Sequence, residues 1–407
     1  MNGAHNCVYL YSALDRAVLH MHKTKLLTML CTVVLLAARS SVWARQSPIP
    51  GAEQTSAYLP ALLNKRVGLV VNHTAQVGSG HLIDALQSRN VLIKKVFVPE
   101  HGFWGDVEAG RPVEDVTDPT AGLRWISLYG KRKYLSPAML SDVDVLVFDM
   151  QDVGVRCYTY LTTLHYAMQA CAQSGTPLIV LDRPNPNVHV VDGPILKPQF
   201  RSFVGRHPIP LAHGMTLGEL ALMINGEGWL DEGATCLLKV VPVRHYTRTT
   251  LFAPSTAPSP NLTTAHAVHL YPSLCLFEGT CMSVGRGTPG AFERLGYPDP
   301  HFGEFCFTPS KMHLGAVPKH AGRQCFGIDL RQARCESYLQ LEWLLKCYAV
   351  AVEQHIRFFE NGFDIHSGDD ALRIQIESGW SAEKIRSSWR PALEAFCKRR
   401  KPYLLYP

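Results

Sequence analysis

The chain has 407 residues, of which 46 % are hydrophobic and 18 % are charged, and its formal net charge is +6. This is an ordinary globular composition with enough apolar material for a sizeable core. The positive charge is not gathered in a long basic run. The densest cluster, "CKRRK" at 397–401, is typical of a solvated helix end. We therefore expect no nucleic-acid partner.

Residues 21–44 have the form of a secretory signal peptide. The basic stretch "MHKTK" precedes the apolar run "LLTMLCTVVLLAA", and small residues at Val42 and Ala44 end the segment. The apolar run is shorter than the roughly 20 residues that a membrane-spanning helix needs. We expect cleavage near Ala44, an exported product in the periplasm or medium, and no stable membrane anchor after cleavage. Residues 1–20 precede a suitable start at Met21.

Two of the 12 cysteines, Cys7 and Cys31, precede the expected cleavage site. The others would lie in an oxidising compartment, where disulfides form. No pair has the C-x-x-C spacing of a metal knuckle. The alternative to disulfides is that most of these thiols are buried as small hydrophobic side chains.

Strand and helix patterns alternate over the first half of the chain. Gly175 marks one helix end, and Thr216 with Glu219 forms a capping box at the start of another. Such alternation predicts an α/β fold with a mostly parallel sheet covered on both faces. The predicted strands are 66–72, 92–98, 143–152, 177–186 and 237–243, and the predicted helices are 81–89, 158–175 and 215–228.

The pattern changes after residue 250. A Pro/Ser-rich segment, "APSTAPSPN" at 253–261, is typical of a segment that crosses from one domain to the next, and we call it the crossing segment. Residues 265–330 are rich in Gly and Pro with short strand-like pieces, whereas 336–360 and 381–400 are helical. We predict an upstream extension with signal peptide at 1–44, an N-terminal domain at 45–255 and a smaller α+β domain at 256–407.

Polar side chains follow four of the predicted strands. One such residue is more often a turn or cap residue than a ligand. Four strand ends of this kind are harder to explain by turns, because ligands bind beyond the carboxyl ends of parallel strands. The residues are Asn72; Glu100 and His101; Asp149, Gln151 and Asp152; and Asp182, Arg183 and Asn185.

The sequence lacks the motifs of several enzyme classes. It has no full G-x-G-x-x-G fingerprint, no P-loop, no G-x-S-x-G and no H-E-x-x-H. We therefore expect no nucleotide cofactor and no metal. What remains is carboxylates, amides, arginines and loop aromatics such as Phe103 and Trp104, which is typical of a sugar site. The structural alternatives are that Glu100 caps a turn, His101 is a core histidine, and Arg156 pairs with Asp149 or Asp152.

Several blocks in combination identify a family. They include "GLVVNHTA", "FVPEHGFWGDVEAG", "SLYG", "DVLVFDMQDVGVRCYTY", "LDRPNPN", "IPLAHGMTLGELA" and "FEGTCMSVGRGT", and they run in order through nearly the whole chain after the signal segment. The sequence resembles the NamZ-type exo-β-N-acetylmuramidases, formerly a family of unknown function. The resemblance implies a Rossmann-like N-terminal domain, a smaller C-terminal domain and a site in the cleft between them.

The resemblance also implies hydrolysis of terminal, non-reducing N-acetylmuramic acid from peptidoglycan-derived disaccharides or muropeptides. Glu100 maps onto the candidate general acid, and His101 would orient it or contact substrate. The second carboxyl stays open among Asp149, Asp182, Asp192 and Glu278, or the substrate's own N-acetyl group acts instead. Asp192 and Cys281 depart from the family pattern. The remaining predicted substrate-binding residues are Asn72, Trp104, Gln151, Arg156, Tyr158, Arg183, Asn185, His213 and Arg286.

An arginine is expected to hold the lactyl carboxylate of muramic acid, with Arg156 slightly favoured over Arg286, and Arg183 as a further candidate. Two other classes of function stay open at this point. One is an exported sugar- or muropeptide-binding protein without turnover. The other is a metal- or nucleotide-dependent enzyme on a Rossmann-like sheet.

Overall fold

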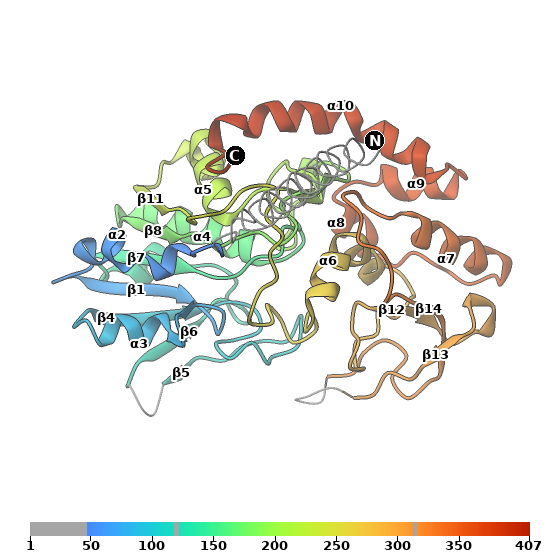
Figure 1. Ribbon diagram of the computed structural model, residues 1–407, viewed down its shortest axis with the longest axis horizontal. Helices are drawn as coiled ribbons and strands as arrows, with labels where there is room; N and C mark the ends of the chain where they lie inside the picture. The colour runs from blue at the N-terminus through green and yellow to red at the C-terminus, as the bar shows by residue number, and fades with distance from the viewer. Residues whose placement is uncertain (1–46, 118–121, 312–315) are drawn as a thin grey trace, which may run out of the picture. The chain divides into compact units, whose positions relative to one another are not determined.

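Six parallel strands form the centre of the fold in the computed structural model, which describes residues 47–117, 122–311 and 316–407 (Figure 1). A short antiparallel strand, β5, completes a seven-stranded sheet. The spatial order is β11 (Leu238–Val241), β8 (Leu178–Leu181), β7 (Val145–Asp149), β1 (Arg66–Val71), β4 (Leu92–Val98), β6 (Arg124–Ser127) and β5 (Val116–Thr117).

The sheet is doubly wound. The chain runs from β1 outward through β4 to β6 and then returns to the other side of β1 for β7, β8 and β11. This order confirms the predicted α/β, Rossmann-like class. In such sheets the strand order reverses at a switch point, here between β1 and β7, and ligands bind beyond the strand ends near it.

Both faces of the sheet are buried, which is why its strands read as continuous apolar runs. Val70 and Phe148 belong to the hydrophobic cluster that includes helices α4 (Tyr160–Ser174) and α5 (Leu217–Gly226). Their neighbours Leu69 and Val147 belong to a second cluster, with α3 (Leu82–Gln87). Alternate residues of one strand therefore serve opposite layers.

The helix ends follow the predicted signals. Thr216 accepts a hydrogen bond from the backbone N–H of Glu219, and the Glu219 side chain accepts from the N–H of Thr216, so the capping box is confirmed. Gly175 ends α4 with φ +71°. Only a residue without Cβ adopts that conformation at little cost.

The C-terminal part carries a three-stranded antiparallel sheet in the order β12 (Arg294–Tyr297), β14 (Cys325–Asp329) and β13 (Phe305–Phe307). The prediction of short strand pieces from residue 265 was wrong at its start, because 265–274 is a helix, α6 (Ala265–Leu274), despite Pro272. The helices that follow are α7 (Glu342–Glu353), α8 (Phe363–Ser367), α9 (Ala371–Glu377) and α10 (Ala382–Arg400).

The C-terminal segment returns to the large sheet after α10 (Figure 1). The Tyr406 hydroxyl donates a 2.5 Å hydrogen bond to Asp182, which follows β8. One hydrophobic cluster also runs from Phe148 in the sheet to Phe277 and Phe292 in the C-terminal part. Residues 48–407 thus form one compact unit, and the domain boundary at 255/256 stays a prediction.

The shorter elements are α2 (Thr55–Tyr58), the hairpin of β2 (Gln76–Val77) and β3 (Gly80–His81), and the pair β9 (Val191–Asp192) and β10 (Ala212–His213). No helix in the described ranges has the length and apolar character that a bilayer crossing requires. The predicted signal segment lies outside the described residues. All cysteines within the described residues are free thiols, and most of them are buried.

Candidate active site

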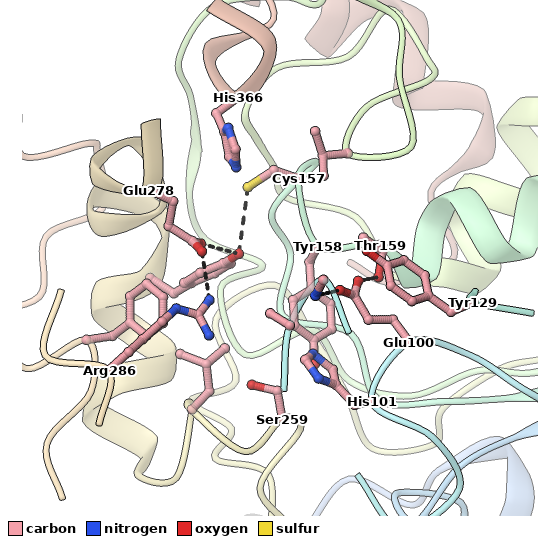
Figure 2. Close-up of a pocket in the computed structure, with 16 residues that line it drawn as sticks. Glu100, His101, Tyr129, Cys157, Tyr158, Thr159, Ser259, Glu278, Arg286 and His366 are labelled. Atoms are coloured by element: carbon pink, nitrogen blue, oxygen red, sulfur yellow. Dashed lines mark hydrogen bonds and ion pairs between the residues drawn. The ribbon is translucent and has the colours of Figure 1, made fainter. Parts of the chain in front are cut away.

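A cavity of about 280 Å³ lies beyond the strand ends, between the large sheet and the C-terminal part (Figure 2). Loops after β4, β6 and β7 form one wall, and α6 with the turns that follow it forms the other. Its lining residues are Glu100, His101, Ala109, Gly110, Tyr129, Cys157, Tyr158, Thr159, Val204, Ser259, Leu262, Tyr271, Glu278, Arg286, Phe292 and His366.

Glu100 follows β4 and is held at both carboxylate oxygens. The backbone N–H of Gly110 donates to Oε1 at 2.8 Å, and the Thr159 hydroxyl donates to Oε2 at 2.7 Å. The residue is 6 % exposed. A hydroxyl can donate to a carboxylate or accept from a carboxylic acid, so the Thr159 contact accommodates Glu100 in both protonation states.

The turn that carries Glu100 explains the glycines of "EHGFWG". His101 and Gly102 have φ of +72° and +73°, and Gly105 has φ +70°. A Cβ on Gly105 would lie 1.9 Å from the His73 ring, so no other residue fits there. Left-handed backbone at a non-glycine residue such as His101 is strained, and such strain gathers at functional sites.

His101 is buried beside Glu100, and Nδ1 lies 2.7 Å from the carbonyl oxygen of Val107. A carbonyl only accepts, so Nδ1 carries the proton and Nε2 is left as an acceptor. Burial lowers the pKa of His101, although the neighbouring Glu100 carboxylate acts in the opposite direction. The ring is therefore neutral near pH 7 and suited to orienting groups rather than to carrying charge.

The opposite wall carries Arg286, Glu278 and Tyr271. Nη2 of Arg286 donates to Oε2 of Glu278 at 2.7 Å, and the guanidinium lies 5.1 Å from the centre of the Phe292 ring. Burial raises the pKa of Glu278, but the charge and hydrogen bond of Arg286, together with the nearby His366 and Lys319, outweigh it and the net pKa is lowered. Glu278 stays ionised, so it is a charge partner for Arg286 and not a proton donor.

Tyr129 and Tyr158 complete the wall on the Glu100 side. The Tyr158 hydroxyl donates to the carbonyl of Pro258 at 2.7 Å, which ties this wall to the crossing segment. Burial first, and then the Glu100 carboxylate, raise the pKa of Tyr129 above its ordinary value. Tyr129 therefore keeps its proton and remains a hydrogen-bond donor at neutral pH.

The structure brings five of the predicted site residues to this cavity: Glu100, His101, Tyr158, Glu278 and Arg286. Of the four candidates for a second carboxyl, only Glu278 lines it. Asp149 is fully buried and pairs with Arg183 at 2.5 and 2.9 Å, so neither residue is free to contact a sugar. Asp192 accepts from the backbone N–H groups of Gly193 and Leu339.

Arg156 was favoured as the lactyl clamp, but it does not face the cavity. The side chain is 1 % exposed. Its guanidinium donates to four main-chain carbonyls, those of Pro194, Ile209, His366 and Ser367. It therefore joins β9–β10 to α8 as a structural residue. The salt bridge to Asp149 or Asp152 that was the structural alternative does not form either, among the described residues.

Four more predicted residues hold the loops beyond the sheet. The Asn72 amide donates to the Tyr160 hydroxyl, and the Gln151 amide donates to the carbonyls of Asp152 and Pro184. The Asn185 amide donates to Met215. His213 is fully buried, and burial lowers its pKa to about 3. The three amide side chains are used in hydrogen bonds within the protein, and Nδ1 of His213 accepts from the backbone N–H of Met215, while its Nε2 has no partner among the described residues. None of the four side chains lines the cavity.

Two further residues have roles away from the cavity. Asp182 is buried beneath the donors Thr216, Gly218 and Tyr406, and burial raises its pKa to about 7. Trp104 is 66 % exposed and packs edge-on against Phe103, outside the cavity. The described residues hold no group of three or more side chains suited to a metal ion.

Sequence reasoning missed several lining residues, above all Thr159, Tyr129 and Gly110. Thr159 and Tyr129 lie in the blocks "CYTY" and "SLYG", but a hydroxyl in a loop carries no local signal of its role. Gly110 acts through its backbone N–H, which no residue type reveals. Only their proximity to Glu100 in the fold shows what they do.

Comparisons with known proteins identify the family of this chain. Residues 67–266 match the N-terminal family model of exo-β-N-acetylmuramidase NamZ, and residues 269–406 match the C-terminal one. The chain is 38 % identical over 371 residues to the peptidoglycan β-N-acetylmuramidase NamZ of Bacillus subtilis strain 168, covering 86 % of this chain and 89 % of that protein.

Two solved structures from Bacteroides fragilis, both of the DUF1343 family, share the fold. One has a TM-score of 0.82 and 41 % identity, covering 89 % of this chain and 99 % of the other. The second has a TM-score of 0.73 and 29 % identity, covering 88 % and 99 %. The chain therefore belongs to the exo-β-N-acetylmuramidase NamZ family of glycoside hydrolases.

Proposed function

We propose that this protein is an exo-acting glycosidase that releases terminal, non-reducing N-acetylmuramic acid from peptidoglycan fragments, with Glu100 as general acid. The observation that carries the proposal is a buried carboxyl, fixed at both oxygens, on one cavity wall opposite a buried arginine on the other. The relative from Bacillus subtilis supports the substrate class.

In the proposed reaction Glu100 gives its proton to the glycosidic oxygen as the bond between that oxygen and the anomeric carbon breaks. Water then adds to the anomeric carbon, and a proton returns to Glu100. Gly110 and Thr159 keep the carboxyl in one orientation, which lowers the entropic cost of reaching the transition state. His101 offers an unprotonated Nε2 as an acceptor for a sugar hydroxyl.

Arg286 is the proposed contact for the lactyl carboxylate. Among the described residues its one side-chain hydrogen bond goes to Glu278, and the next acidic oxygen, on Glu108, is 4.0 Å away. Donors of the guanidinium fork are therefore left for a ligand. Glu278 is paired with Arg286 and is therefore a poor nucleophile. This pairing favours attack on the anomeric carbon by the substrate's N-acetyl group or by water over attack by a protein carboxylate.

The test is hydrolysis of a chromogenic N-acetylmuramic acid glycoside beside its N-acetylglucosamine analogue. Glu100→Gln keeps the shape of the side chain but removes the proton, and we expect a loss of about 10²–10⁴-fold for a poor leaving group and a smaller loss for an activated one. Glu353→Gln, an exposed change on α7, is the matched control. A sugar-binding protein without turnover would release no product, and a Glu100→Gln variant as active as wild type on both substrates would exclude this acid.

Export to the periplasm or medium is a second part of the proposal. It rests on the signal-like segment at 21–44. Mass analysis of protein recovered outside the cytoplasm should give an N-terminus near Arg45. Recovery of the intact N-terminus in the membrane fraction would contradict it.

A further inference from the structure

A row of aromatic rings leads away from the active-site cavity. The ring centres of Tyr129 and Phe203 are 5.4 Å apart, those of Phe203 and Tyr166 are 6.4 Å apart and nearly parallel at 17°, and those of Tyr166 and Tyr134 are 6.2 Å apart. Tyr129 lines the cavity, whereas Tyr134 at the far end is 56 % exposed.

Two cations accompany these rings. Nζ of Lys133 lies 5.0 Å from the Tyr129 ring and 5.5 Å from the Phe203 ring, and it has no ion-pair partner in the part of the chain that the structure describes. The Arg206 guanidinium lies 4.9 Å from the Tyr166 ring and is paired with Asp231 at 3.2 Å. The row is buried at Tyr129, half-buried at Phe203 and Tyr166 and exposed at Tyr134, and the charge of Lys133, unpaired among the described residues, lies beside its inner end.

The position of the row relative to the acid defines which part of a substrate meets it. Figure 2 shows Arg286 and Glu278 on one wall of the cavity and Glu100 with Tyr129 on the other. Glu100 must touch the glycosidic oxygen, and Arg286 is the proposed contact for the lactyl carboxylate of the terminal sugar. The terminal sugar therefore lies toward Arg286 and the leaving group lies on the Tyr129 side. The row therefore begins where the leaving group emerges.

We propose that Tyr129, Phe203, Tyr166 and Tyr134 form a binding surface for the leaving-group side of a longer peptidoglycan fragment. Successive sugars would lie with their C–H faces on the rings. Lys133 would contact a carboxylate of that fragment, on a lactyl group or a peptide stem. This inference rests on the proposed function and extends it, because it makes chain length and carboxylate content part of substrate recognition.

The surface beyond the row has the same charge preference. Tyr134 also lines a second cavity, of about 390 Å³, whose wall includes Lys95, Arg124, Arg132 and the acidic Asp115. Lys95 and Arg132 are paired with acidic residues, while Arg124 has no ion pair within the described ranges. The charge left unpaired in this wall, among the described residues, is the Arg124 guanidinium, which suits a carboxylate of the same fragment.

The experiment compares kcat/KM for three substrates: a nitrophenyl N-acetylmuramic acid glycoside, the disaccharide with N-acetylglucosamine, and the corresponding tetrasaccharide. Tyr134→Ala and Phe203→Ala should lower kcat/KM for the tetrasaccharide by roughly five- to tenfold and leave the nitrophenyl glycoside within about twofold. Lys133→Gln should affect the tetrasaccharide, whose leaving group carries a carboxylate, and not the disaccharide, whose leaving group has none.

The matched control is Tyr338→Ala. Tyr338 is 40 % exposed and Arg386 lies 4.9 Å from its ring, as Arg206 does from Tyr166, but it lies in neither cavity. Equal losses on all three substrates, or no loss on the tetrasaccharide, would overturn the inference. If Phe203→Ala proves unstable, the Tyr134→Ala variant, at an exposed position, still tests the inference with the same three substrates. Wild-type protein that hydrolyses none of the substrates would instead refute the proposed function.

Discussion

The Thr159 hydroxyl donates a 2.7 Å hydrogen bond to Oε2 of Glu100. This bond joins the loop after β4 to the residue that precedes α4, so two separate crossovers of the sheet meet at the proposed acid. The carboxyl of Glu100 is thereby fixed by the fold rather than by its own loop alone.

Removing that hydroxyl should lower turnover without weakening binding. A hydrogen bond to a charged group contributes about 1.5–3 kcal/mol. We therefore expect Thr159→Val to reduce kcat by roughly 10- to 100-fold with KM within about twofold of wild type. Thr159→Ser, which keeps the oxygen, should restore most of the activity. If Thr159→Val turns over substrate as wild type does, the Gly110 N–H alone is enough to hold Glu100.

Arg286 and Arg156 should respond differently to the same change. Arg286→Lys removes the guanidinium fork at the cavity, and we expect kcat/KM for the muramic substrate to fall by roughly 10- to 150-fold with little change for the glucosamine analogue. Arg156→Lys breaks contacts with main-chain carbonyls away from the cavity, so it should lower the free energy of unfolding and leave substrate selectivity unchanged. Loss of selectivity in Arg156→Lys, with Arg286→Lys unaffected, would reverse this assignment.

The regular elements of the large sheet were predictable because their signals are local. A parallel strand buried on both faces is apolar throughout, and β1, β4, β7, β8 and β11 all lie within predicted strands. The strand β6 was missed because only four residues, "RWIS", carry its pattern. Helix α6 was missed because Gly and Pro in the surrounding segment point to irregular structure, whereas tertiary packing decides.

The cavity was predictable only in part, for a reason that Arg156 and Asp182 illustrate. Polar residues at strand ends either face a ligand or satisfy buried backbone groups, and the sequence pattern is the same in both cases. Arg156 serves backbone carbonyls and Asp182 accepts from a helix N-terminus, whereas Glu100 lines the cavity. Which role applies depends on contacts across more than 30 residues of chain, as with Arg156 and Ser367.

Two glycines with similar backbone conformations should differ in their tolerance of a side chain. Gly154 in "QDVG" and Gly175 after α4 have φ of +79° and +71°. A Cβ on Gly154 would lie 2.2 Å from Oδ1 of Asn185, whereas one on Gly175 would meet nothing within 4 Å. Gly175→Ala should cost about 1 kcal/mol of unfolding free energy from backbone strain alone, and Gly154→Ala about 3 kcal/mol. If urea unfolding gives similar losses of unfolding free energy for the two variants, the Asn185 side chain moves aside at little energetic cost.

A buried histidine should make the protein less stable in mild acid. His165 is fully buried on α4, and neither ring nitrogen has a hydrogen-bond partner within the described residues. Burial, helped by the nearby Arg206 charge, lowers the pKa of His165 from 6.5 to about 4. In the unfolded chain His165 is protonated below about pH 6.5, whereas in the folded chain it is protonated only below about pH 4. The free energy of unfolding therefore decreases as the pH falls from 6.5 to 4.

Replacing His165 by Phe should remove this dependence, because Phe fills the same space beside Tyr166 and His207 without titrating. The relevant quantity is the change in unfolding free energy between pH 7 and pH 4, which includes opposing contributions such as that of Asp152, whose pKa burial raises to about 7. Contributions from groups that do not interact with His165 cancel when variant and wild type are compared. We expect His165→Phe to recover about 3 kcal/mol of the unfolding free energy that wild type loses between the two pH values.

The exposed change His355→Gln is the control and should leave the pH profile of wild-type stability as it is. Parallel profiles for wild type and His165→Phe would mean that a water molecule or a rearrangement satisfies the charged ring in the folded state.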